Sequence, residues 1–171
     1  KHFVGDGGTF AGIDRGDTRL PLDVLINEHG AGYKPAIAAG VQTVMASFNS
    51  WNGEKVHGNR ELLTDVLRGD LGFDGFVVSD WNGIGEVVGC GDDDCPQAIN
   101  AGIDMVMVPE DWLSTLENIV AQVQSGVISE ARIDEAVLRI LKIKFESGLM
   151  QRELPSKEGR PLRSPVGSDE H

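Results

Sequence analysis

Basic residues are scarce in this chain. Lysine and arginine number 15 against 27 aspartates and glutamates, which gives a formal net charge of −12. Nucleic acids and anionic membrane surfaces are bound through basic patches, so this balance argues against either as a partner. Long hydrophobic runs are missing too. No stretch approaches the about 18 apolar residues of a transmembrane helix, so we expect no membrane insertion.

Cysteine is almost absent as well. Its two copies, Cys90 and Cys95, share a Gly-Asp-rich loop with no histidine nearby, which leaves a two-cysteine metal site without partners. A small-loop disulfide is the favoured interpretation and suggests an exported protein, while two free thiols remain an open alternative. The run Asp92-Asp93-Asp94 lacks the spaced ligands and closing glutamate of a calcium loop, so it predicts a solvated acidic turn. We predict no metal site.

The chain does have a repeated order of short apolar strand, polar loop and helix. Strand-like segments are expected at residues 1–4, 41–48, 76–79 and 105–108. Capping signals and helical periodicity predict helices between and after them, at residues 33–39, from Asn59 to Leu67 with Gly69 closing it, at 96–101, after Glu110, and after Ser129. The last two helices each carry a periodic apolar face.

This alternation is typical of βα units around a parallel sheet, and it predicts an α/β fold. A complete eight-stranded barrel takes about 250 residues. Only roughly four strand ends are visible, so residues 1–150 are expected to be the C-terminal half of a TIM-like (β/α)8 barrel whose other half precedes Lys1. Residues 151–171 are polar, proline-containing and without an apolar face, which predicts an interdomain linker.

Chemically useful side chains collect where the strands end. The segment 75–81 (G-F-V-V-S-D-W) delivers a carboxylate, Asp80, and then an indole, Trp81. Ligands are handled at this end of the strands in parallel α/β proteins. An indole face can stack on a pyranose while a carboxylate attacks or orients the sugar. Taken alone, Asp80 as a loop acid and Trp81 as a rim residue would be the ordinary interpretation.

The other strand ends change that interpretation. They offer hydrogen-bonding and aromatic groups: Lys1 and His2, then Phe48 with Asn49, Trp51 and Asn52, then Met107 with Glu110. Each has an ordinary explanation, since Met107 is more often core filler and Trp51 can cover a barrel rim. Their recurrence at the same end of successive strands favours a sugar-binding site.

Four segments in order resemble the signature blocks of glycoside hydrolase family 3. They are residues 1–9 (K-H-F-V-G-D-G-G-T), 45–53 (M-A-S-F-N-S-W-N-G), 75–81 and 101–109 (A-G-I-D-M-V-M-V-P). The nearest branch is that of the β-glucosidases and exo-β-glucanases, and the resemblance covers nearly the whole chain. It implies a secreted or periplasmic retaining glycosidase that releases terminal β-linked glucose from β-glucosides or β-glucans and needs no organic cofactor.

The resemblance also implies residue roles. Asp80 matches the catalytic nucleophile, which forms a glycosyl-enzyme intermediate. Lys1 and His2 match the pair that binds hydroxyls of the sugar in the −1 subsite. Trp81 matches the aromatic residue at the −1/+1 boundary, and Met107 lies against the same pocket. The remaining substrate-binding residue is Phe48, which stands where some family members carry tyrosine and so lacks a hydroxyl.

A retaining mechanism needs a second carboxyl about 5–5.5 Å from the nucleophile. In the glucosidase branch the resemblance implies that a following α/β sandwich domain supplies it, outside this chain. In the N-acetylglucosaminidase branch an Asp–His pair in the loop after the first block does so. Here that loop contains acids and an arginine (Asp6, Asp14, Arg15 and Asp17) but no histidine, which weighs against that branch. Possible acids within the chain are Glu54, Glu86 and Glu110.

We therefore expect this chain to be inactive without a preceding half-barrel and a following sandwich domain. Two alternatives stay open. One is a β-xylosidase or N-acetyl-β-glucosaminidase of the same family, and the other is a catalytically dead sugar-binding relative.

Overall fold

The computed structural model describes residues 1–151 and 167 of the chain. The strands are β1 (Asp17–Thr18), β2 (Thr43–Met45), β3 (Ser50–Trp51), β4 (Glu54–Lys55) and β5 (Phe76–Val78). The α-helices are α1 (Leu22–Val24), α2 (Tyr33–Ala38), α3 (Pro96–Ala101), α4 (Trp112–Gln124) and α5 (Glu130–Glu146). Tighter or wider helical turns are η1 (Asp6–Gly8), η2 (Phe10–Gly12), η3 (Leu25–His29), η4 (Val56–Gly58), η5 (Glu61–Asp70) and η6 (Gly83–Glu86). The linker predicted for 151–171 falls almost wholly outside the described residues.

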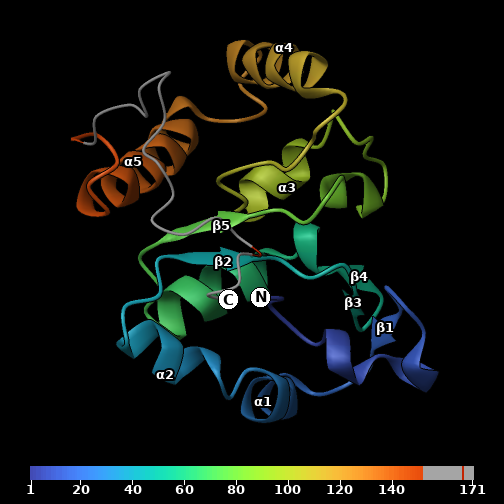
Figure 1. Cartoon of the computed structure of the whole chain (residues 1–171). Coiled ribbons are helices and arrows are strands. Elements are labelled where there is room, and N and C mark those ends of the chain that lie inside the picture. Colours follow the sequence, from blue (N-terminus) through green and yellow to red (C-terminus); the bar gives the residue numbers. More distant parts are fainter. Residues whose placement is uncertain (152–166, 168–171) are drawn as a thin grey trace.

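Four chain segments lie parallel and side by side. Phe3 bridges Ala46 just after β2, β2 pairs with β5 along its whole length, and Val78 of β5 bridges Met105. Figure 1 shows α1 and α2 on the β2 side of this layer and α3, α4 and α5 on the β5 side. The predicted α/β fold and the parallel arrangement of the four segments are confirmed.

All four predicted strands are shorter in the structure. Residues 1–4 form only the bridge at Phe3, and residues 76–79 contribute only Phe76–Val78. The segment 41–48 contributes only Thr43–Met45, because the Val41 N–H still donates to a carbonyl of α2 at 3.1 Å. The segment 105–108 is a single bridge rather than a strand. There the Met107 N–H donates to the Ser79 hydroxyl at 2.7 Å, so a side chain replaces the next backbone partner.

The helix caps follow the sequence closely. The Asn59 side chain accepts the Leu62 N–H at 2.8 Å, and the Ser129 hydroxyl accepts an N–H of the first turn of α5 at 3.2 Å. Both predicted caps are confirmed. The predicted end at Gly69 is wrong, because η5 continues to Asp70 and the left-handed glycine is Gly72, with φ 73°.

A fully buried carboxylate ties the sheet to the helices around it. Asp104 accepts the Val77 N–H at 2.9 Å and pairs with the guanidinium of Arg68 from η5. It also pairs with Arg132 at 2.9 Å and Arg139 at 3.0 Å, both from α5. η5 also contributes buried apolar side chains to the same core as β2 and β5, namely Leu62, Leu63, Val66 and Leu67.

A second small sheet lies beside this layer. β1 pairs in parallel with β3, and β3 runs antiparallel to β4. The Gly53 N–H donates to Asp17 at 2.8 Å, and this hydrogen bond lowers the pKa of the Asp17 carboxyl. The sheet joins the loop before Asp17 to the loop after β2, and these two loops form one side of the site described below.

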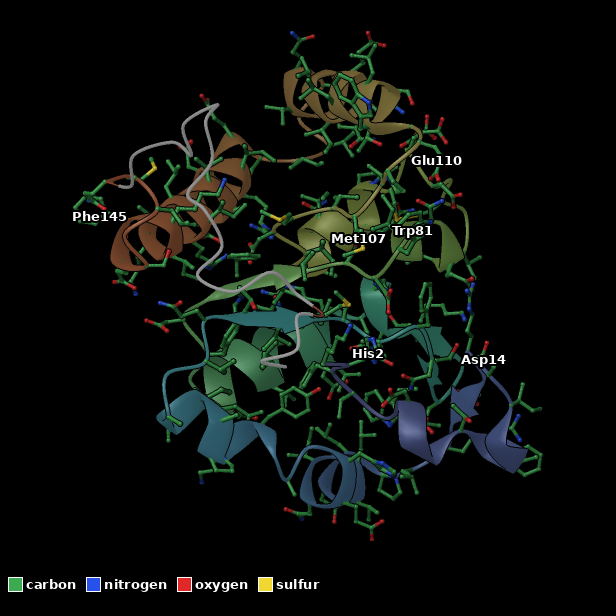
Figure 2. The ribbon with its side chains drawn as sticks, viewed as in Figure 1. His2, Asp14, Trp81, Met107, Glu110 and Phe145 are labelled. Carbon is green, nitrogen blue, oxygen red and sulfur yellow. A yellow bond between two sulfur atoms is a disulfide. The ribbon has the colours of Figure 1, made fainter. Side chains whose placement is uncertain are left out.

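The periodic apolar faces predicted for the last two helices are present but uncovered within the described residues. Leu116 of α4 is 55% exposed and Phe145 of α5, labelled in Figure 2, is 63% exposed. Neighbours on the same helices are also exposed, namely Trp112, Leu113, Val120, Val137, Leu138 and Leu141. Among the described residues, no helix is both long and apolar enough to span a membrane.

Candidate active site

The ends of the parallel segments open into one pocket of about 320 Å³. His2 from the first segment, Phe48 after β2 and Asp80 after β5 all line it. The loop that follows the first segment forms the facing wall, with Asp6, Thr9, Asp14 and Arg15. Figure 2 shows His2 in the middle of the molecule and Asp14 on the loop to its right. The structure thus brings together three of the six predicted site residues.

Asp80 is held at every polar atom. Its carboxylate Oδ1 accepts the Trp81 N–H at 2.7 Å, and its Oδ2 lies 3.4 Å from His2 Nε2. Its carbonyl accepts the Gly83 N–H at 3.0 Å. Its own N–H donates to His57 Nε2 at 2.9 Å. The side chain is 16% exposed and faces the pocket, so the carboxylate is both positioned and accessible.

His2 lies between two carboxylates. Its Nε2 faces Asp80, and its Nδ1 lies 3.2 Å from Asp6 Oδ2. The Gly7 N–H donates to the other oxygen of Asp6 at 3.1 Å and so orients this second acid. A neutral imidazole carries a single N–H, so a neutral His2 cannot donate to both carboxylates at once. Sequence reasoning counted Asp6 only as a loop acid and missed its contact with His2.

The ring of Phe48 stacks against a charged side chain. The Arg15 guanidinium lies 4.2 Å from the centre of its ring, a cation–π contact. Arg15 and Lys55 each contact Glu86 at 3.1 Å, and Lys55 also donates to the Phe48 carbonyl at 3.0 Å. Although burial raises the pKa of Glu86, the hydrogen bonds and charges of Lys55 and Arg15 lower it overall. A carboxylate held ionised by two cations is a poor proton donor, so Glu86 is unsuited to the role of general acid.

The other predicted residues lie outside the pocket lining. Lys1 is exposed at the start of the chain, and Trp81 is 54% exposed. Met107 is half-buried, and its carbonyl accepts the N–H of Asn82, the residue after Trp81, at 2.9 Å, so the two backbone segments are adjacent. Figure 2 shows both between His2 and Glu110. Glu54 accepts a hydrogen bond from an asparagine side chain instead of facing the pocket.

His57 is a site residue that sequence reasoning missed. It is fully buried, and burial lowers its pKa to about 4. Its ring is therefore neutral near pH 7, and its Nε2 is free to accept the Asp80 N–H. No spacing rule connects positions 57 and 80, because they meet only through the packing of η4 against the turn after β5.

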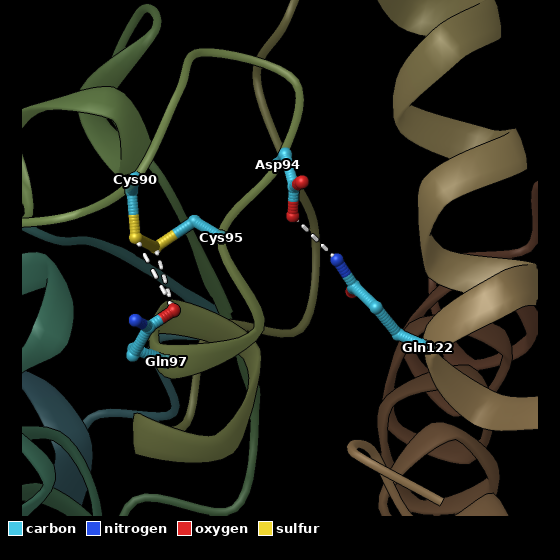
Figure 3. The surroundings of a disulfide bond; sticks show 5 residues. All are labelled: Cys90, Asp94, Cys95, Gln97 and Gln122. Atoms are coloured by element: carbon cyan, nitrogen blue, oxygen red, sulfur yellow. Dashed lines mark hydrogen bonds between the residues drawn. A yellow bond between two sulfur atoms is a disulfide. The ribbon is translucent and has the colours of Figure 1, made fainter. Parts of the chain in front are cut away.

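The predicted disulfide between Cys90 and Cys95 is confirmed, with the two Cα atoms 4.8 Å apart. Figure 3 shows the Gln97 amide against its sulfur atoms and Gln122 of α4 donating to Asp94 at 2.6 Å. Another acid of the loop, Asp92, accepts from the Asn82 side chain at 3.2 Å. The acidic turn is exposed, as predicted, but it also joins α4 to the residue that follows Trp81.

A parallel α/β arrangement with an accessible carboxylate at a strand's end defines a protein that handles a polar ligand at the carboxyl edge of its sheet. Comparison with known families identifies which class of protein this is. The model described as "Glycosyl hydrolase family 3 N terminal domain" matches residues 1–143. The chain belongs to glycosyl hydrolase family 3, and the resemblance found in the sequence is confirmed.

Individual relatives agree with this assignment. The chain is 36% identical to a lysosomal beta glucosidase of Dictyostelium discoideum, an alignment that covers 91% of this chain and 20% of that one. It is 31% identical to a periplasmic beta-glucosidase of Salmonella typhimurium over 100% of its own length and 23% of the other. A solved exo-1,3/1,4-beta-glucanase from a Pseudoalteromonas species superposes with a TM-score of 0.90 and 56% identity, covering 94% and 26%. The chain thus spans about a quarter or less of these proteins.

Proposed function

We propose that this chain supplies the nucleophile of a retaining β-glucosidase or exo-β-glucanase. The observation that carries the proposal is Asp80, whose backbone N–H and carboxylate Oδ1 are hydrogen-bonded and whose side chain is open to the pocket at the end of β5. It attacks the anomeric carbon of a terminal β-linked glucose and forms a glycosyl-enzyme ester, while the glycosidic C–O bond breaks and the general acid protonates the departing oxygen. Water then hydrolyses the ester, giving its proton to the same acid/base group and releasing glucose. The names of the three related proteins support glucose as the sugar released.

The surrounding side chains then bind the substrate. His2, between Asp80 and Asp6, donates to a sugar hydroxyl or to the nucleophile, and Lys1 reaches the same sugar from the start of the chain. Phe48 forms an apolar wall at the pocket. Trp81 and Met107 border it on the side of α4, where an exposed indole can stack on the departing sugar.

Residues 1–150 are, in this proposal, the C-terminal half of a (β/α)8 barrel, and 151–171 are the linker to an α/β sandwich domain. The four parallel segments with open outer edges support the first part. The exposed apolar faces of α4 and α5 support contact with further parts of the same protein. Glu86 is paired with two cations, and Glu54 and Glu110 do not line the pocket. Asp6 and Asp14 do line the pocket, but Asp6 contacts His2. The resemblance to the glucosidase branch implies that the sandwich domain supplies the acid/base, so we place that residue outside this chain.

The protein is proposed to act outside the cytoplasm, in the periplasm or after secretion. The Cys90–Cys95 disulfide supports this location, because disulfides persist in oxidising compartments. The periplasmic beta-glucosidase among the relatives supports it as well.

The test is covalent trapping with a 2-deoxy-2-fluoro-β-glucoside on the complete gene product. The fluorine slows hydrolysis of the ester, so mass spectrometry should find one fluoroglucosyl group on the peptide that contains Asp80. Asp80→Asn should stay unlabelled, whereas the matched surface control Asp65→Asn should label like the wild type. Faster trapping by a fluoroxyloside would redirect the proposal to a β-xylosidase. Sugar binding without labelling or turnover would indicate a dead relative.

A further inference from the structure

The pocket is backed by a histidine that no substrate can touch. His57 is fully buried between the strand ends. The ring of Phe48 lies against it, with ring centres 5.8 Å apart, and Gly83 closes the other side. A Cβ atom at position 83 would come within 2.3 Å of His57 Nε2. The imidazole therefore occupies a fixed position and has no room to turn away from Asp80.

The His57 ring supplies a hydrogen-bond acceptor for a backbone N–H just after the end of β5. The Ser79 N–H donates to the Met105 carbonyl at 2.9 Å, on one side of the strand. Because successive residues of a strand point their N–H groups to opposite sides, the Asp80 N–H faces the β2 side. His57 Nε2 accepts it there at 2.9 Å in place of a carbonyl. Without this acceptor the N–H would be left without a partner in a largely buried place.

We propose that His57 is a positioning residue that aims the Asp80 carboxylate by holding its backbone N–H. This inference rests on the proposed role of Asp80 as nucleophile. Two of the four contacts to Asp80 then have separate roles. The Trp81 N–H contacts the carboxylate itself, whereas His57 fixes the main chain from which the carboxylate projects.

A neutral acceptor suits this task. The carboxylate changes from an anion to an ester and back during turnover, and a bond to the backbone N–H does not depend on that charge. A protonated His57 would instead present an N–H to the N–H of Asp80 and break the bond. Burial keeps the ring in its neutral form. Because Nε2 accepts the Asp80 N–H, the single proton of the neutral ring belongs on Nδ1.

The test compares two amides at one position in the complete gene product. The side-chain amide of Gln reaches the place of His Nε2, whereas that of Asn reaches only the place of Nδ1. His57→Gln should keep the trapping rate by the fluoroglucoside within a few-fold of wild type. His57→Asn should lower that rate and kcat by about 10²-fold, the typical effect of a misplaced reacting group, while KM and the binding constant of the inactivator change little.

Melting temperatures separate this effect from a loss of folding. Should His57→Asn fail to fold, Gly83→Ala displaces the ring instead and should slow trapping at least tenfold. A folded His57→Asn protein with the wild-type trapping rate would overturn the proposal. Equal losses of trapping rate in His57→Gln and His57→Asn would also overturn it. The same holds if neither His57→Asn nor Gly83→Ala folds, because His57 would then be a packing residue only. If the wild type itself is not labelled on Asp80, the proposed function fails, and it fails separately from the role of His57.

Discussion

Neutralising Asp104 should destabilise this protein more than any exposed charge change. Its side chain is 0% exposed and binds three arginines, of which Arg68 and Arg132 are themselves only 12% exposed. In Asp104→Asn the amide keeps the size of the side chain but presents N–H donors to guanidinium N–H groups. Several buried positive charges then lose their counter-charge.

The expected loss of unfolding free energy comes from the arginines, which stay buried without a counter-charge. Removing one member of a buried charged pair costs about 3–5 kcal/mol, because the partner stays desolvated. With a urea dependence of about 2 kcal/mol/M, the unfolding midpoint of Asp104→Asn should fall by about 1.5–2.5 M. Asp104→Leu should do no better, since it removes both oxygens and leaves the arginines in place.

The control is Asp74→Asn. Asp74 also pairs with α5, through Lys142 at 2.7 Å, but both side chains are exposed, at 80% and 43%. Screened surface pairs contribute little, so its midpoint should stay near that of the wild type. Urea unfolding followed by tryptophan fluorescence measures both variants. Equal midpoints for Asp104→Asn and Asp74→Asn would refute the view that Asp104 neutralises the arginines of the core.

Two further predictions concern the disulfide and Glu86. Because the cysteines are separated by 5 residues, the loop-entropy relation predicts that Cys90→Ser with Cys95→Ser loses about 2 kcal/mol of unfolding free energy. A melting temperature unchanged by this double substitution or by reduction would contradict it. Burial raises the pKa of Glu86, but Lys55 and Arg15 lower it overall, so its ion pairs stabilise the fold above the ordinary glutamate pKa of 4.5 and cease to do so as the pH falls through the folded-state pKa. Glu86→Gln should therefore melt below the wild type at pH 7 and together with it in strong acid; a constant difference across pH would count against the ion pairs.

Several local features could be predicted from the sequence alone. The caps at Asn59 and Ser129 were predictable because a side chain reaches only the N–H groups of its own first turn. The disulfide was predictable because two cysteines in one short loop have few other partners. The end of η5 was mispredicted. Position 69 carries glycine, the residue that commonly follows the end of a helix, but η5 continues to Asp70.

The sequence by itself determined the α/β alternation, the parallel direction of the segments, the family, and the carboxylate at the end of β5. These depend on short-range patterns, namely buried strands, glycine loops and helical periodicity. Only the tertiary structure decided that His57 meets the Asp80 backbone, that Asp6 meets His2, and that Asp104 is surrounded by arginines. Contacts between distant positions such as 57 and 80 leave no periodic trace in the chain, because they arise from how finished elements pack.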